Sequence, residues 1–152
     1  RMKLLVDTNV LLDCMLERKP FDKPASLLML LGEIGEMDLF MSGSQVTDAY
    51  YLLTNGGKQG RANIAKRALA DARKFIRIAP ITEREIDAAL DSTWDDVEDA
   101  CVYQAARSIK ADAIITRNQK DFEKSSIKVL DCEEFFTWLK EDKGVEYGEV
   151  EL

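Results

Sequence analysis

The chain has 152 residues, 46% of them hydrophobic and 32% charged, which is the length and composition of one soluble globular domain. It contains no histidine, and this excludes Ser-His-Asp and Cys-His catalysis as well as zinc sites with imidazole ligands. Three cysteines without a Cys-x-x-Cys pair, and no apolar run of membrane-spanning length, indicate a cytoplasmic protein that does not enter a membrane. The net charge of −7, taken alone, disfavours nucleic-acid binding, because phosphate contacts need a positive surface.

The pattern of apolar residues predicts strands and helices that alternate along the chain. Thr82-x-x-Glu85 is a capping box that begins one helix, and Gly56-Gly57 ends another. In chain order the predicted elements are a strand at 3–6, helices at 9–17 and 25–36, a strand at 38–41, a loop running into a helix at 42–55, a helix at 61–74, a strand at 75–79, helices at 82–90 and 95–110, a strand at 113–116, a short helix near 119–124, a strand at 127–130 and a helix at 132–141.

Five strands, each followed by a helical segment, predict an α/β fold with a central, mostly parallel sheet of about five strands that is covered on both faces. We expect one domain over residues 1–152, with an acidic tail at about 142–152 that forms a solvated or frayed end. The start RMKLLVD leads directly into strand and helix patterning, so no signal peptide is expected. In such a sheet the working site lies at the carboxyl ends of the strands.

Acidic residues recur at that predicted edge. The apolar run Leu4-Leu5-Val6 stops at Asp7, and further acids follow the second strand, precede the fourth strand at the start of a helix, and follow the fourth strand. Residues three apart near a helix start share one face, which brings two of these acids together. The candidates are Asp7, Asp48, the pair Asp96 and Asp99, and Asp121 with Asn118 close before it.

Gathering several carboxylates costs free energy, because like charges repel and raise one another's pKa. A bound cation offsets that cost, and a set of oxygen ligands suits Mg²⁺ or Mn²⁺. Such an ion can lower the pKa of a water and offset charge on a phosphoryl oxygen without histidine. The acids therefore predict a divalent-metal hydrolase of phosphodiesters.

Each acid also has an ordinary structural interpretation. Asp7 suits the N-cap of the first helix as well as it suits a metal ligand. Asp48 within a helix is typical of a solvated surface residue, and the acids at 95–99 would stabilise the N-terminus of their helix through its dipole. Asp121 would fit a turn. The recurrence of acids from all four segments at one sheet edge favours a metal site over these separate structural interpretations.

The stretches LLVDTNVLLD, Ser42 with Asp48 six residues later, and DDVEDACVYQAARSIKADAIITRNQKDF resemble the PIN domain, in order and over nearly the whole chain. The last stretch is the most specific of the three. The resemblance implies a three-layer α/β/α fold and a Mg²⁺- or Mn²⁺-dependent endoribonuclease that leaves a 5′-phosphate. Many small single-domain members are the toxins of VapBC-type toxin–antitoxin pairs.

The family's site residues carry over one by one. Asp7, Asp48 and Asp99 match the three core acids, and Asp121 or Asn118 matches the fourth position; these four acids are the expected catalytic and metal-binding set. Asn9 and Thr116 match polar residues that support the site, and Asn118 and Asp96 are counted with them. Two positions depart from the family pattern: the second acid is usually Glu, whereas Asp48 is one methylene shorter, and Asn118 stands where Asp is common.

The expected partners are an RNA substrate and a cognate antitoxin. Arg117, Arg61 and Lys58 are the candidates for contacting RNA, while a solvated helix face is the alternative for basic residues of this kind. An apolar surplus at 27–31 and 50–53 favours a homodimer, with deep burial as the alternative. The competing functions are a catalytically decayed PIN module that binds RNA or acts as a scaffold, and, with less support, a phosphoaspartyl enzyme that uses Asp7. The sequence does not define the RNA target.

Overall fold

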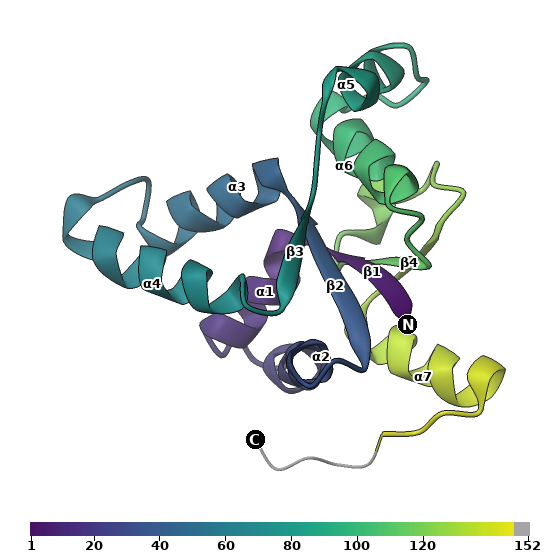
Figure 1. Cartoon of the computed structure of the whole chain (residues 1–152), viewed down its shortest axis with the longest axis horizontal. Coiled ribbons are helices and arrows are strands. Elements are labelled where there is room, and N and C mark those ends of the chain that lie inside the picture. Colours follow the sequence, from purple (N-terminus) through teal and green to yellow (C-terminus); the bar gives the residue numbers. More distant parts are fainter. Residues whose placement is uncertain (148–152) are drawn as a thin grey trace.

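The computed structural model describes residues 1–147, apart from the side chain of Gln59, and is built on a five-stranded sheet in which neighbouring strands run parallel (Figure 1). The strand order is β3-β2-β1-β4-β5, so that β1 lies in the middle between β2 and β4. The strands are β1 (Met2–Val6), β2 (Met37–Ser42), β3 (Ile76–Ala79), β4 (Ala113–Ile115) and β5 (Lys128–Leu130). The predicted α/β fold with a parallel sheet is confirmed.

Seven α-helices and two short 3₁₀ helices surround the sheet within the described part of the chain. The α-helices are α1 (Thr8–Met15), α2 (Asp22–Glu33), α3 (Gly43–Leu53), α4 (Ala62–Ala72), α5 (Glu83–Leu90), α6 (Val97–Ser108) and α7 (Cys132–Lys143). The 3₁₀ helices are η1 (Gln59–Arg61) and η2 (Gln119–Phe122). Among residues 1–147 no helix has the length and apolarity that crossing a bilayer requires.

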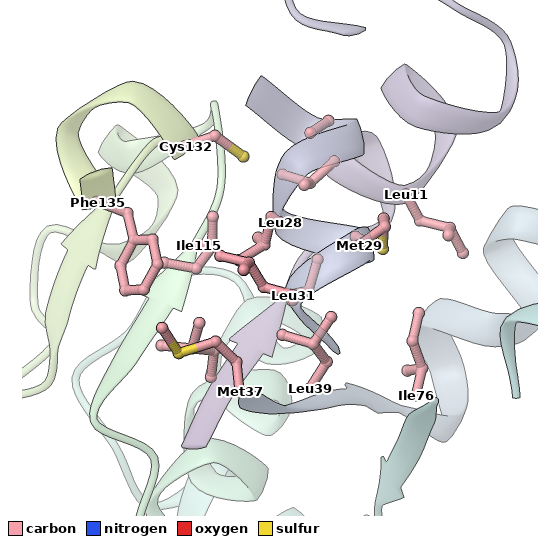
Figure 2. Close-up of a cluster of buried hydrophobic side chains, with 14 of the residues drawn as sticks. Leu11, Leu28, Met29, Leu31, Met37, Leu39, Ile76, Ile115, Cys132 and Phe135 are labelled. Carbon is pink, nitrogen blue, oxygen red and sulfur yellow. The ribbon is translucent and has the colours of Figure 1, made fainter. Parts of the chain in front are cut away.

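The two faces of the sheet bury separate hydrophobic clusters. Side chains alternate along a strand, so Leu4 and Val6 of β1 point to one face and Leu5 to the other. Helices α1, α2, α4 and α7 contribute buried residues to the first cluster, which includes Leu28 of α2 and Phe135 of α7 (Figure 2). Helix α6 covers the second face, and α5 packs on α6. The layers are therefore α/β/α, with β1 buried on both faces.

Helices α3 and α4 lie side by side and extend away from the sheet (Figure 1). Helix α3 begins at Gly43, directly after β2, without the loop that the sequence predicts there. The reason is a capping box, in which Ser42 and Gln45 satisfy each other's backbone N–H groups. Residues beyond Ser42 therefore turn from strand to helix at the sheet edge, where the candidate acids are expected.

The C-terminal helix α7 runs to Lys143, two residues past its predicted end. Gly144 ends it with a φ of 67°, a left-handed conformation that glycine adopts without steric cost. Tyr147 then packs against the first hydrophobic cluster. Of the tail predicted at about 142–152, residues 148–152 lie outside the described part of the chain.

Candidate active site

Asp7 occupies the carboxyl end of the central strand and also begins a helix. Its backbone N–H donates to the carbonyl of Ile115 (2.9 Å), which continues the pairing of β1 with β4. Its side chain caps α1, with Oδ1 accepting from the backbone N–H of Thr8 at 2.7 Å. Asp7 is thus the N-cap of α1, as the helix-cap interpretation predicts.

The Asp7 carboxylate accepts three further hydrogen bonds that a cap does not require. Oδ1 accepts from Gln45 Nε2 at 2.9 Å, and Oδ2 accepts from Thr116 Oγ1 at 2.6 Å and from Asn9 Nδ2 at 3.2 Å. All of these donors are neutral. They fix the direction of the carboxylate and leave its negative charge uncompensated, which is the condition in which a carboxylate can still bind a cation.

Two of these supporting residues lie just beyond the ends of the neighbouring strands β4 and β2. Thr116 follows β4 and is 0% exposed, and its Oγ1 also accepts from the backbone N–H of Asn118 at 2.9 Å. Gln45 lies in the first turn of α3, after β2, and is 4% exposed. Sequence reasoning included Asn9 and Thr116 but missed Gln45. The Ser42-x-x-Gln45 spacing of a capping box was the available signal.

A second group of acids gathers near Asp7 from α3 and α6. Glu98 has a raised pKa, first because its carboxyl hydrogen-bonds with that of Asp48, and then because of the charges of Asp48, Asp96 and Asp7. The structure therefore places Asp48, whose segment follows β2, against the start of α6. Glu98 was interpreted from the sequence as an ordinary acid at a helix N-terminus, and its contact with Asp48 crosses between helices.

Asp99 has the most strongly shifted carboxyl of the group. Partial burial raises its pKa to about 6, and the charges of Asp96, Asp121, Asp7 and Glu98 add to the effect. The backbone N–H of Asp99 donates to Asp96 Oδ1 at 3.0 Å, so Asp96 is the N-cap of α6. Asp121 lies in η2 and is exposed. The charges of Asp7 and Asp121 thus act on Asp99, whereas Asp48 acts on Glu98.

The donor set suits a hard divalent ion, because it offers carboxylate oxygens whose mutual repulsion a cation would relieve. As the side chains stand, no three His, Cys, Asp or Glu residues between 1 and 147 are arranged to hold a metal ion. A cation would therefore have to draw the carboxylates closer together than they lie here.

A cleft of about 500 Å³ opens beside Asp7 and Asp48, and its lining includes residues of α1, α3 and the segment after β4 but not Asp99 or Asp121. Asp7, Asp48 and Asn118 are among its walls. Tyr51 and Leu52 of α3 add an apolar rim and are 57% and 61% exposed. The cleft thus combines two carboxylates, the arginines Arg18 and Arg117, and an exposed aromatic and aliphatic pair.

Arg117 also lines this cleft, but an ion pair holds its guanidinium in place. Its Nε and Nη2 donate to the two carboxylate oxygens of Asp13 at 2.7 and 3.0 Å, and the group stacks over Phe21 at 4.0 Å from the ring centre. Asp13 is 1% exposed and also accepts from Arg18 Nε at 2.9 Å. Asp13 is a second residue that the sequence analysis missed.

Lys58 and Arg61 lie on the connection between α3 and α4, at the opposite end of α3 from Ser42 (Figure 1). The structure does not bring them into the cleft lining. Their role in contacting RNA stays a prediction, to be tested by substitution.

The parallel sheet, the two covered faces and the acids at the carboxyl ends of β1, β2 and β4 define a three-layer α/β/α protein with an acidic site. A family model described as PIN domain matches residues 3–120, which is most of the chain. The chain belongs to the PIN-domain family.

Named relatives agree with this assignment. Ribonuclease VapC1 of Aquifex aeolicus (strain VF5) is 29% identical over 141 residues, covering 88% of this chain and 92% of that protein. FitAcB from Neisseria gonorrhoeae has a similar fold, with a TM-score of 0.67 at 17% identity over 86% of this chain and 98% of its own. A toxin–antitoxin complex from Klebsiella pneumoniae gives 0.61 at 20% identity over 85% and 97%. The two structural similarities show the fold alone.

Proposed function

We propose that this protein is a Mg²⁺- or Mn²⁺-dependent endoribonuclease and the toxin of a toxin–antitoxin pair. The observation that carries the proposal is the Asp7 carboxylate, which four neutral donors hold in place at the sheet edge and whose charge acts on Asp99. The similarity to a protein named ribonuclease VapC1 supports RNA as the substrate class. Structures named as toxin–antitoxin complexes support a protein partner.

In this proposal Asp7 and Asp99 hold the ion, and Asp48 and Asp121 bind it or its waters. A bound divalent ion supplies a water of lowered pKa and offsets charge on the phosphoryl oxygen. Asn9 and Thr116 keep the Asp7 carboxylate oriented. Glu98, in contact with Asp48, adds a carboxylate on the side where this chain has the shorter acid.

The partners follow from the surface around the site. Tyr51 and Leu52 on the cleft rim supply apolar area that an antitoxin or a second copy of the chain would cover. Leu28 and Leu31, which were part of the apolar surplus that favoured a homodimer, are buried in the core instead. The prediction of a homodimer therefore depends on the exposed apolar residues of α3. Light scattering of the purified chain tests this prediction.

The decisive test of the function is cleavage of a single-stranded RNA in Mg²⁺ or Mn²⁺, compared with the same reaction in chelator. We expect metal-dependent cleavage, and a loss of roughly a thousandfold or more in Asp7→Asn, because that variant removes several kcal/mol of charge stabilisation from the ion. Asp71→Asn is the matched control, since Asp71 lies exposed on α4 and pairs with Lys74.

Cleavage by Asp7→Asn at the wild-type rate, or cleavage that continues in chelator, would contradict the proposal. RNA binding by the wild type without any metal-dependent cleavage would instead favour a catalytically decayed PIN module that binds RNA.

A further inference from the structure

The side chain of Gln45 makes two kinds of hydrogen bond at once. Its Oε1 accepts from the backbone N–H of Ser42 at 3.0 Å and from Ser42 Oγ at 3.1 Å, which completes the capping box of α3. Its Nε2 donates to Asp7 Oδ1 at 2.9 Å. One amide therefore joins the N-terminus of α3 to the carboxylate at the end of β1.

The capping box determines which way this amide faces. The backbone N–H of Ser42 is a donor only, so the atom that faces it must be the oxygen of Gln45. The NH₂ group is then left to face Asp7. Because Gln45 is 4% exposed, water cannot readily take the place of either contact.

The other two capping boxes in the described part of the chain carry glutamate at the position of Gln45. They pair Thr82 with Glu85 and Asp131 with Glu134. Glutamate caps a helix as well as glutamine does, and its charge suits a helix N-terminus. At position 45, however, glutamate would place an acceptor oxygen against an acceptor oxygen of Asp7. The requirement for an NH₂ group at this place is therefore set by Asp7 and not by the helix.

We propose that Gln45 is a positioning residue for the reaction proposed above: it holds Asp7 Oδ1 through Nε2 and couples the placement of α3, which carries Asp48, to that carboxylate. The link to catalysis rests on the proposed function, whereas the contact with Asp7 does not. A residue that served only to cap α3 would accept glutamate without loss.

The test is the substitution Gln45→Glu in the full chain, alone and combined with Asp7→Asn, with thermal melts in chelator and RNA cleavage in Mn²⁺. We expect Gln45→Glu to lower the melting temperature when Asp7 is intact. In the Asp7→Asn background the amide oxygen still faces the Thr8 N–H, but the charge that repels the new carboxylate is gone, so most of that loss should disappear. We expect kcat of the single variant Gln45→Glu to fall roughly ten- to a hundredfold through misplacement of the Asp7 carboxylate, with KM within about twofold.

The matched control is Glu134→Gln, the opposite exchange in the capping box of α7, for which we expect unchanged kcat. A Gln45→Glu variant as stable as the wild type, or one whose loss is the same in the wild-type and Asp7→Asn backgrounds, would overturn the contact. A stability loss that depends on Asp7 but leaves kcat unchanged would overturn the positioning role. If the wild type cleaves no RNA in the presence of Mn²⁺, the proposed function fails. The melting temperatures of the single and double variants still decide whether Gln45 holds Asp7.

Discussion

Asp13 is the most deeply buried acid in the described part of the chain, and two arginines neutralise it. Arg117 forms a bidentate ion pair with Asp13, and Arg18 Nε adds a third contact. Nη2 of Arg18 also donates to the carbonyl of Asn9 at 3.1 Å. The backbone N–H of Arg117 reaches the side-chain oxygen of Asn9 at 3.4 Å. Asp13 thus ties α1 to the segment after β4, next to the candidate site.

Replacing Asp13 by Asn keeps its shape and removes the charge that both arginines face. We expect the free energy of unfolding to fall by about 2 to 3 kcal/mol, less than for a fully buried pair because both arginines are partly exposed. Urea unfolding at constant m-value measures this change. Asp71→Asn, which removes an exposed pair with Lys74, should change it by less than about 1 kcal/mol. Equal effects of the two substitutions would contradict this account of Asp13.

Asp99 makes the stability of the metal-free protein depend on pH. Its pKa is raised to about 6, first by partial burial and then by neighbouring carboxylates, so the folded state favours the protonated acid. That stabilisation is present below about pH 4 and is lost as the pH rises through 6. As the pH rises over this range in chelator, we expect the melting temperature of Asp99→Asn to increase relative to that of the wild type.

The opposite trend serves as the control for that prediction. The backbone N–H of Asp131 and the side chain of Gln119 lower the pKa of Glu134, so its contribution to stability is lost as the pH falls. Glu134→Gln should therefore lose stability relative to the wild type as the pH rises. A constant difference between Asp99→Asn and the wild type from about pH 4 to about pH 7 would show that Asp99 is not shifted in the folded protein.

Helix α2 packs closely on the sheet at Gly32. A Cβ atom added there would lie 2.4 Å from Cδ1 and 2.8 Å from Cγ of Leu39, which is fully buried in β2. Gly32→Ala would usually stabilise a helix, but here the overpacking should prevail, and we expect a net loss of about 1 to 2 kcal/mol by urea unfolding. At Gly43, the first residue of α3, the added atom meets nothing within 4 Å. Gly43→Ala should thus be neutral or stabilising, and equal stability of the two variants would refute the close packing.

At the level of elements, local sequence patterns predict a helix boundary where contacts between residues close in sequence determine it. The capping box of Thr82 and Glu85 begins α5 where the sequence places it. The equivalent box of Ser42 and Gln45 was missed, and a loop was expected instead. What makes Gln45 notable is its bond to Asp7, 38 positions away, which no local pattern contains. The pair of Asp13 and Arg117 is separated by 104 positions and escaped prediction for the same reason.

At the level of the whole molecule, the strand order explains why acids far apart in sequence meet. Because β1 lies between β2 and β4, the residues that follow these strands lie at one edge, and this brings Gln45 and Thr116 to opposite oxygens of Asp7. Alternation of strand and helix predicts this edge. It does not predict how far each carboxylate reaches, which depends on rotamers and on contacts such as that of Glu98 with Asp48.

Calorimetric titration of the metal-free protein with Mn²⁺ measures whether the Asp7 carboxylate and its neighbouring acids bind a divalent ion. We expect saturable binding by the wild type and by Asp71→Asn, and an affinity at least about tenfold lower in Asp7→Asn, since loss of even an outer-shell partner has an effect of that size. Equal Mn²⁺ affinity of the wild type and Asp7→Asn, or no saturable binding by the wild type, would contradict the account.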